Sequence, residues 1–381
     1  MPLSDEPQEL LVAVGGLGPA RCCVDSNGEL SLSGLVRAPS TAPGDDEADS
    51  DWLIGAACGK LYRVKDKGLL PPFGGQTGVG SSNAITNGGD VSLNGRFALA
   101  YSYGTGEAAV LKLEWRGVAD GDVTGWVQGS LRAHTERCTY DPALADRQDQ
   151  SHLHQARLHP LSNRWAFFPD LGCDKVWIYA FDPKIGTLST EPTALDLPHG
   201  SGPRHCDFHP SGAFLYITCE LDGTVVVASC DDETGVLTIV QVISALPAGS
   251  EPDRGPNMGN AHIRCSVDGR SVYTSTRSDD SITTFAVEEG GAQLKYVQHI
   301  PSGGKCPVHF GLDPNCRYLW CANSGSQNVV CFEIAPAEEG GALKQRSTLT
   351  LPAAHGPGYV SSPQPQLKLL PFAEAVRRVK L

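Results

Sequence analysis

The stretch GPRHCDFHPSGAFLYITCELDGTVVV, residues 202–227, decides the fold of this chain. A short apolar run leads into the turn His-Pro-Ser-Gly, and a second run rich in Phe, Leu, Tyr and Ile follows, which is typical of a β-hairpin. The same frame recurs as GGDVSLNGRFALAYSYGTGEAAVLKL (88–113), HLHQARLHPLSNRWAFFPDLGCDKVWIY (152–179), NAHIRCSVDGRSVYTSTRSDDSITTFAV (260–287) and CPVHFGLDPNCRYLWCANSGSQNVVCFEI (306–334). Repetition of this kind is the sequence signature of a repeat architecture.

One position in the turn fixes the register between the copies. We take Pro160, Pro210, Val267 and Pro314 as equivalent, and the intervals between them are 50, 57 and 47 residues. Each interval has room for four short strands separated by turns, which predicts a four-stranded antiparallel sheet per unit. Such sheets repeated around an axis make a β-propeller. The sequence therefore predicts an all-β protein built as one continuous array.

Weaker copies bring the predicted number of blades to seven. Residues 10–32 contain two strand-like runs, and 51–70 is a shortened copy with an outer strand at 61–64. We expect 38–50 and 133–150 to be solvated loops. The apolar residues 366–370 are expected to pair with the first blade, because closing the ring removes exposed strand edges. The prediction is a single seven-bladed propeller domain over residues 8–372, closed by its N- and C-terminal strands, and a short basic tail at 373–381.

The charge of the chain argues against several classes of partner. Its 381 residues carry a formal net charge of -13, so we expect neither nucleic acid nor an anionic membrane surface as a partner. The N-terminus MPLSDEPQEL lacks the pattern of a secretory signal, and no apolar run has the length of a membrane span, which favours a cytoplasmic protein. The 13 cysteines include no zinc-type pair, and most lie in predicted strands, where a free thiol packs as a small hydrophobic group.

Two slots of the repeat hold unlike residues in neighbouring copies. Positions are counted from the equivalent turn residues, Pro160, Pro210 and Val267. Six positions before this turn residue lie His154 and Arg204. Ten positions after it lie Asp170, Glu220 and Arg277. Both slots fall at the end of the hairpin away from the turn. Because equivalent positions of a propeller lie at nearly the same distance from its axis, the side chains in these slots are expected to cluster around one mouth of the central channel. Departures from a consistent pattern are where function is expected. A structural interpretation stays open, because such residues can also hydrogen-bond a turn or tie two blades together.

Other motifs in the chain give weaker signals. His152 and His154 would point the same way on a strand and could chelate a metal, but a third ligand at recognisable spacing is missing, so we expect no metal and no cofactor. GGQTGVG at 74–80 lacks the Lys-Ser/Thr of a phosphate loop, and neither G-x-S-x-G nor H-E-x-x-H occurs. We expect His205 and His209 to be packing or turn partners.

At these positions the sequence resembles the seven-bladed lactonase family, which includes propeller 6-phosphogluconolactonases of the bacterial type and fungal carboxy-cis,cis-muconate cyclases. The matching segments are HLH (152–154) with DLGCDKV (170–176), GPRH (202–205) with CELD (219–222), and STRSDDSI (275–282). The chain departs from the family pattern at Val308, at Ser102 and near Asp90. The resemblance implies an active site built on His154, Arg204, Glu220 and Arg277.

The leading functional prediction is metal-independent hydrolysis of a small anionic lactone, with 6-phosphogluconolactone favoured. Arg204 and Arg277 would bind anionic groups and stabilise the oxyanion, and Asp170 is a further candidate for substrate binding. His154 would take the proton of the attacking water while Glu220 orients that water or shares the proton, and the sequence leaves open which of the two is the general base. A lactonising muconate cyclase, a metal-dependent lactonase and a non-catalytic binding propeller remain as alternatives.

Overall fold

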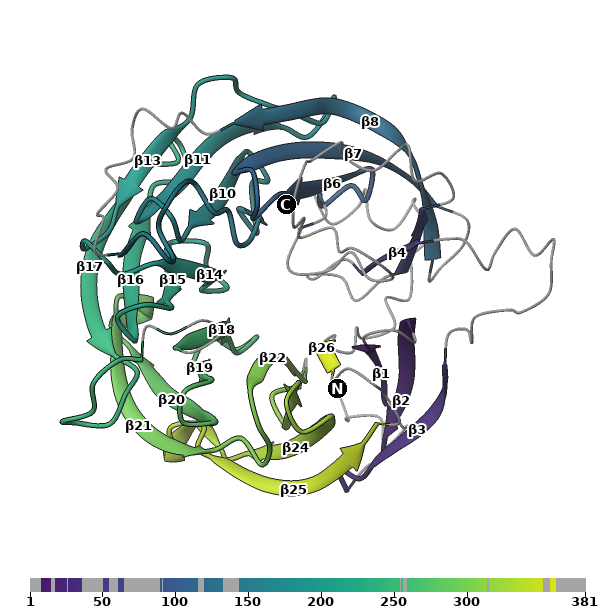
Figure 1. Cartoon of the computed structure of the whole chain (residues 1–381), viewed down its shortest axis with the longest axis vertical. Coiled ribbons are helices and arrows are strands. Elements are labelled where there is room, and N and C mark those ends of the chain that lie inside the picture. The colour runs from purple at the N-terminus through teal and green to yellow at the C-terminus, as the bar shows by residue number, and fades with distance from the viewer. Residues whose placement is uncertain are drawn as a thin grey trace, which may run out of the picture.

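The strands of the protein are arranged as sheets around a central axis (Figure 1). The computed structural model describes residues 8–14, 18–25, 27–35, 51–54, 61–64, 90, 92–115, 120–132, 144–253, 255, 259–313, 315–351 and 357–360. Helical segments in these ranges are short 3-10 turns such as Glu289–Gly291 and Ala337–Glu339. The predicted all-β propeller is confirmed.

The blades of β14–β17, β18–β21 and β22–β25 are antiparallel sheets, with the first strand nearest the axis and the last at the rim (Figure 1). Three blades have the expected four strands in sequence order, and a fourth has β12 and β13 both beside β11. Their bounds are β9 Arg157–Leu158, β10 Trp165–Asp170, β11 Lys175–Asp182, β12 Thr187–Leu188 and β13 Thr193–Asp196; β14 Pro203–Phe208, β15 Phe214–Cys219, β16 Thr224–Cys230 and β17 Leu237–Ser244; β18 Asn260–Cys265, β19 Ser271–Thr276, β20 Ser281–Glu288 and β21 Gln293–Pro301; β22 Pro307–Leu312, β23 Tyr318–Asn323, β24 Asn328–Ile334 and β25 Leu343–Thr350.

The blade of β14 to β17 shows why the sequence forms these elements. The turn between β14 and β15 contains Gly212 at a φ of 74°, a left-handed conformation that glycine adopts without steric cost. The central strands are almost continuously apolar because both of their faces are covered by other blades. The outer strand β17 instead alternates, with Val240 and Val242 exposed. Burial thus decreases from the axis to the rim.

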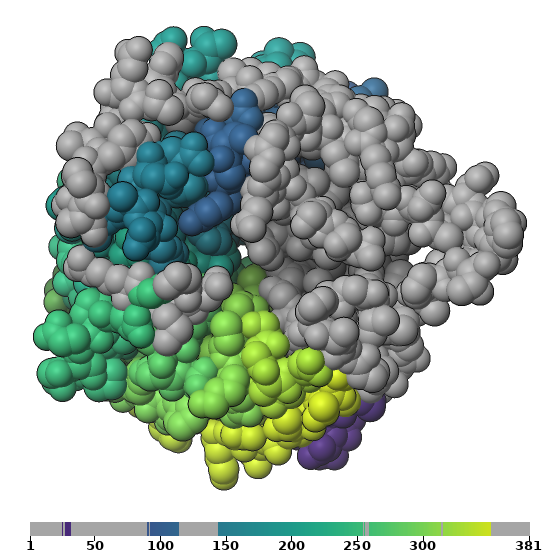
Figure 2. All heavy atoms as spheres, in the orientation of Figure 1, coloured from purple at the N-terminus to yellow at the C-terminus, as the bar shows by residue number. Residues whose placement is uncertain are grey.

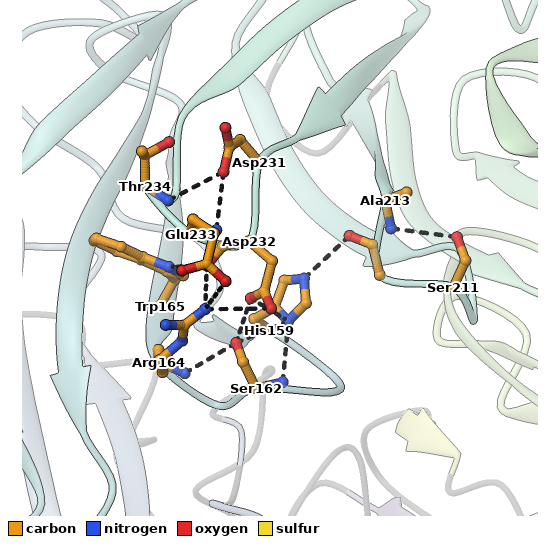
Figure 3. A network of polar contacts seen from close by, with 11 residues as sticks. His159, Ser162, Arg164, Trp165, Ser211, Ala213, Asp231, Asp232, Glu233 and Thr234 are labelled. Carbon is orange, nitrogen blue, oxygen red and sulfur yellow. Dashed lines mark hydrogen bonds and ion pairs between the residues drawn. The ribbon is translucent and has the colours of Figure 1, made fainter.

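Neighbouring blades are held together by apolar packing and by polar contacts at the rim. The core between the blades of β9–β13 and β14–β17 contains side chains from both, including Phe167, Ile178, Phe208, Ile217 and Val226. At the rim of the same two blades, His159 and Trp165 contact Asp232 of the next blade (Figure 3). The Trp165 Nε1–H donates to the Asp232 carbonyl oxygen at 2.9 Å. These contacts join the blade of β9–β13 to that of β14–β17.

The shortened copy predicted at 51–70 is a hairpin in the described residues. It consists of β4, Asp51–Ile54, and β5, Leu61–Val64, the strand expected at that place. β5 pairs in parallel with the long β8, Asp120–Arg132, which also pairs with β7, Glu107–Trp115, and thereby joins β6, Phe97–Tyr101. The described strands consequently form six sheets, one of which joins two of the predicted copies.

The ring is closed by strands from the two ends of the chain, as predicted. β1, Gln8–Val14, pairs antiparallel with β26, Pro357–Val360, while β2, Gly18–Val24, and β3, Leu30–Leu35, complete that blade. The closing strand therefore precedes residues 366–370, which lie outside the described residues together with the tail at 373–381. Figure 2 shows the purple turn of the first blade against the yellow-green last blade, where the Ser347 hydroxyl donates to the Gly28 carbonyl at 2.7 Å.

The expectations drawn from composition have mixed outcomes. Eight cysteines of the described residues are free, and five of them are buried, as expected for thiols in strands. Cys173 is an exception, because it is disulfide-bonded. None of the described residues form a helix long and apolar enough to cross a membrane. The loop expected at 133–150 is not solvated throughout, since Gln148 is 2% exposed; residues 133–143 lie outside the described residues.

Candidate active site

Local backbone geometry brings the predicted side chains to the ends of their hairpins. Glu220 directly follows β15, and its N–H donates to the Gly202 carbonyl at 2.8 Å; Arg277 directly follows β19, and its N–H donates to the Gly259 carbonyl at 2.9 Å. The pairing of β14 with β15 shifts register around Arg204, between Pro203 and His205. A β-bulge of this kind re-aims a side chain, and here it directs Arg204 toward Glu220.

Glu220 is the centre of a buried ionic cluster. Its Oε2 lies 2.8 Å from Arg204 Nε and 2.9 Å from Arg277 Nη2. Its other oxygen, Oε1, accepts a hydrogen bond from Arg147 Nη2. Glu220 is 1% exposed and Arg204 and Arg277 are each 6% exposed, so the carboxylate is held by three guanidinium groups away from bulk water. The predicted grouping of Arg204, Glu220 and Arg277 is present in the structure.

The electrostatics of the cluster favour a negatively charged ligand. Burial raises the pKa of Glu220, but the attraction of Arg277 and Arg204 outweighs burial and lowers this pKa to about 2. Burial and the neighbouring Arg277 lower the pKa of Arg204 to about 10, so its guanidinium stays protonated at neutral pH. Three guanidinium groups around one carboxylate leave an excess of positive charge. An anionic group of a substrate would neutralise this excess.

His154 lies at the edge of the same cluster as an uncharged imidazole. Burial and the proximity of Arg204 hold the pKa of His154 well below its usual range. Its Nδ1 has no hydrogen-bond partner among the described residues, and its ring stands edge-on to those of Tyr103 and His205, with centroid distances of 5.2 and 5.3 Å. The backbone N–H of His154 donates to the Pro169 carbonyl at 2.9 Å, which fixes this segment against β10. A neutral imidazole is the form that can accept a proton.

Asp170 does not join the cluster. Its Oδ2 accepts hydrogen bonds from the Ser151 hydroxyl at 2.6 Å and the Trp177 indole N–H at 2.8 Å. Its Oδ1 accepts the backbone N–H groups of His152 at 2.7 Å and Gly172 at 3.1 Å. Asp170 is 0% exposed, so both oxygens are committed to the protein. We therefore correct the expectation that Asp170 binds substrate and assign it a structural role, in keeping with its position at a turn.

Two residues at the cluster were not among those predicted from the sequence. Arg147 lies in the segment expected to be a solvated loop, but it contacts Glu220 and also donates from Nη1 to the Gly255 carbonyl at 3.1 Å. Tyr103 lies ten positions after Leu93 in the turn Ser-Leu-Asn-Gly, in the same slot as Glu220. Extending the repeat register to the copy at 88–113 would have found Tyr103. No pattern in the sequence marks Arg147, because its segment lies outside the repeated hairpins.

Further imidazoles line the inner strands beside the cluster. His205, His262 and His309 occupy equivalent positions of β14, β18 and β22, and each is at most 4% exposed. The Nδ1 atoms of His205 and His262 are 2.8 Å apart, and the rings of His262 and His309 stack at 3.7 Å. His205 is thus a packing residue, as expected. His209 is a turn residue, as expected, with its Nδ1 2.7 Å from the Ser211 hydroxyl.

The pair His152 and His154 does not have the arrangement of a chelate. Both ring nitrogens of His152 have partners, since Nδ1 lies 2.8 Å from the Tyr103 carbonyl oxygen and Nε2 lies 2.7 Å from Asp149 Oδ1. The His152 ring also stacks on Tyr103 at 4.3 Å. Within the described residues, no group of three or more His, Cys, Asp and Glu side chains is arranged to hold a metal ion. His152 instead supports the ring of Tyr103.

The chain belongs to the seven-bladed β-propeller lactonase family, whose model matches residues 60–355. It is 31% identical over 257 residues to the 6-phosphogluconolactonase of Bacillus subtilis, a match that covers 68% of each chain. It is 28% identical over 300 residues to the 6-phosphogluconolactonase of Sodalis glossinidius, covering 79% of this chain and 80% of the relative. The stretch that the family model matches includes the hairpins that carry the cluster.

The fold is also that of solved structures. The periplasmic gluconolactonase of Pseudomonas aeruginosa superposes with a TM-score of 0.69 and 23% sequence identity, covering 92% of this chain and 98% of that one. A protein from Lactobacillus plantarum superposes with a TM-score of 0.71 and 22% identity, covering 93% and 99% of the two chains. At this level of identity the likeness concerns the fold.

Proposed function

We propose that this protein is a metal-independent lactone hydrolase and that its substrate is 6-phosphogluconolactone. The observation that carries the proposal is a neutral imidazole, His154, whose Nδ1 has no partner among the described residues and which lies beside a cluster of three guanidinium groups. A base next to an excess of positive charge suits the attack of water on an ester that carries an anion. The activity named for the curated relatives supports the choice of substrate.

The guanidinium groups have two tasks in this mechanism. The phosphate of the substrate is bound by the excess positive charge of the cluster, and the oxygen of the lactone carbonyl becomes an oxyanion that a fixed donor stabilises. Arg204 and Arg277 are suited to both tasks because they are buried and held by Glu220 before substrate arrives. Donors that are already oriented need no rearrangement during the reaction.

Between the two candidates for the general base, the proposal assigns His154. Both carboxylate oxygens of Glu220 already contact guanidinium groups, and Arg277 and Arg204 stabilise its charged form. The imidazole of His154 is uncharged at neutral pH, and its Nδ1 has no partner among the described residues. Glu220 is therefore a positioning residue that orients the guanidinium groups, while His154 takes the proton from water.

Purified protein assayed with 6-phosphogluconolactone, corrected for spontaneous hydrolysis, tests this assignment. His154→Asn should lower kcat about 100-fold or more and abolish the acidic limb of the pH profile, because general base catalysis contributes about 10²–10⁴-fold. Glu220→Gln should lower kcat but retain that limb. His199→Asn is the control, since the side chain of His199 is 60% exposed, and it should keep full activity.

Two results would contradict the proposal. Wild-type protein that leaves 6-phosphogluconolactone unchanged but converts a carboxylated muconate would be a cyclase using the same guanidinium groups for carboxylates. His154→Asn protein with unchanged kcat and an unchanged acidic limb would exclude His154 as the base. Circular dichroism of each variant separates loss of activity from loss of fold.

A further inference from the structure

Tyr103 lies beside the cluster, and the proposed mechanism gives it no role. It follows β6 and stands in the repeat slot that holds Glu220 and Arg277 in other blades. The charges of Arg147, Glu220 and Arg204 all act on its phenol. The phenol therefore lies among the charged groups of the site.

The ring of Tyr103 is fixed on two sides. It stacks on His152 at a centroid distance of 4.3 Å, with the planes 14° apart. It meets His154 at 5.2 Å, with the planes 75° apart. His152 is itself held through both ring nitrogens. The base and the phenol are thus neighbouring groups with a fixed relation, and Tyr103 as a residue is only partly buried.

Lactone hydrolysis requires an acid as well as a base. The ring oxygen of an aliphatic lactone leaves as an alkoxide, which is a poor leaving group until it is protonated. The guanidinium groups supply charge and hydrogen bonds but do not give up protons at neutral pH. His154 holds the proton taken from water, and a neighbouring group that protonates the leaving oxygen can recover its own proton from His154. A second proton donor beside His154 would protonate the leaving oxygen as the bond breaks.

We infer that Tyr103 is the general acid that protonates the leaving oxygen; this inference rests on the proposed function. The attacking water gives one proton to His154, and its oxygen forms a bond to the carbonyl carbon. The bond between that carbon and the ring oxygen then breaks, the electron pair stays on the ring oxygen, and the Tyr103 hydroxyl donates its proton to it. The phenolate takes the proton held by His154, which restores both groups.

Arg147 explains why a phenol can do this here. The positive charge of its guanidinium acts on the Tyr103 phenol and stabilises the phenolate that exists between the two proton transfers. Burial raises the pKa of Tyr103, although Arg147 opposes that shift, so the phenol stays protonated at neutral pH and is ready to donate. Arg147 thereby acts as a positioning residue that contacts Glu220 and whose charge acts on Tyr103.

The test lowers the pKa of the Tyr103 phenol while the shape of the side chain stays nearly the same. Replacement of Tyr103 by 3,5-difluorotyrosine lowers the phenol pKa, so the alkaline limb of the kcat profile should move to lower pH, into a range where spontaneous lactone hydrolysis is still manageable. Tyr103→Phe should lower kcat about 100-fold, the lower range for a proton donor, and should lack that limb. Tyr296→Phe, an exposed residue of the outer strand β21, is the matched control and should resemble wild type.

Each outcome decides the matter. A limb that does not move on fluorination, or Tyr103→Phe protein with unchanged kcat, would overturn the inference while leaving the lactonase proposal intact. Wild-type protein without activity on the lactone would instead overturn the proposed function, and the role of Tyr103 would fall with it. The fluorinated protein is nearly isosteric with wild type, so the inference stays testable even if the Phe variant fails to fold.

Discussion

Glu220 and Asp170 occupy the same slot of the repeat in adjacent blades, ten positions after the turn, yet their surroundings differ. Glu220 faces guanidinium groups, whereas Asp170 receives two backbone N–H groups, a hydroxyl and an indole N–H. Uncharged donors leave no positive charge for a ligand, and a cluster of guanidinium groups does. At the scale of single residues, partners rather than position separate a structural carboxylate from one that organises a site.

Asp170→Asn should destabilise the protein without changing substrate affinity. The amide has only one acceptor oxygen, and its NH₂ group would face donors, so buried donors lose their partner at a cost of about 3 kcal/mol. Urea denaturation should show this loss in the free energy of unfolding, while KM for the lactone stays unchanged. A raised KM at unchanged stability would return Asp170 to the substrate-binding residues.

At the scale of elements, the loops that enter the inner strands hold the site by their backbone. Gly259, one residue before β18, accepts the backbone N–H of Arg277 and has a φ of 74°. A Cβ at Gly259 would lie 1.9 Å from the Glu220 carbonyl oxygen. Glycine is required here because both the left-handed conformation and the close approach exclude a side chain.

Gly259→Ala should therefore lose most of kcat/KM as well as stability, because the clash displaces the backbone of Glu220. Gly249→Ala is the matched control: its φ is 84°, but nothing lies within 4 Å of a Cβ there. In the control, only the left-handed conformation of the alanine lowers the free energy of unfolding, by about 1–2 kcal/mol, and kcat/KM should be unchanged. Thermal unfolding and lactone assays of both variants check this, and equal kcat/KM values would show that the close approach has no bearing on the site.

At the scale of the whole molecule, four blades place uncharged imidazoles near one another. Burial lowers the pKa of each well below its usual range; the residues are His154, His205, His262 and His309. The unfolded chain binds these protons near pH 6.5, and the folded protein binds them only at lower pH. The unfolded state therefore holds more protons below pH 6.5, and stability falls as the pH falls.

The free energy of unfolding should decrease by about 1.4 kcal/mol per pH unit for each of these imidazoles below pH 6.5. Denaturant titrations between pH 7 and pH 5 measure this slope. His262→Asn should make the slope shallower, and His199→Asn, an exposed histidine, should leave it unchanged. An equal slope in wild type and in His262→Asn would mean that this imidazole is protonated in the folded protein.

The sequence by itself determined the repeat, its strands and the slots that face the site. These follow from local chemistry, because turn residues and apolar runs such as those around Pro210 set the hairpin and hence the end at which Arg204 and Glu220 lie. Ring closure was predictable because it removes exposed strand edges, and among the described residues the strand from the C-terminal part of the chain that pairs with β1 is 357–360. The same register, extended to the copy at 88–113, would also have predicted Tyr103 at the site.

Only the tertiary structure decided which partners each side chain has. Arg147 meets Glu220 across 73 residues of sequence, from a segment outside the repeat, and no periodic pattern contains that contact. Asp170 and Glu220 share a slot, but Glu220 is held by guanidinium groups from its own blade, the next blade and the segment of Arg147, whereas Asp170 receives only uncharged donors from residues 151–177. The position of a residue relative to the turn determines its distance from the propeller axis and the end of the hairpin at which it lies. The charge around a side chain depends on what other blades and loops bring to it, and this requires the folded ring.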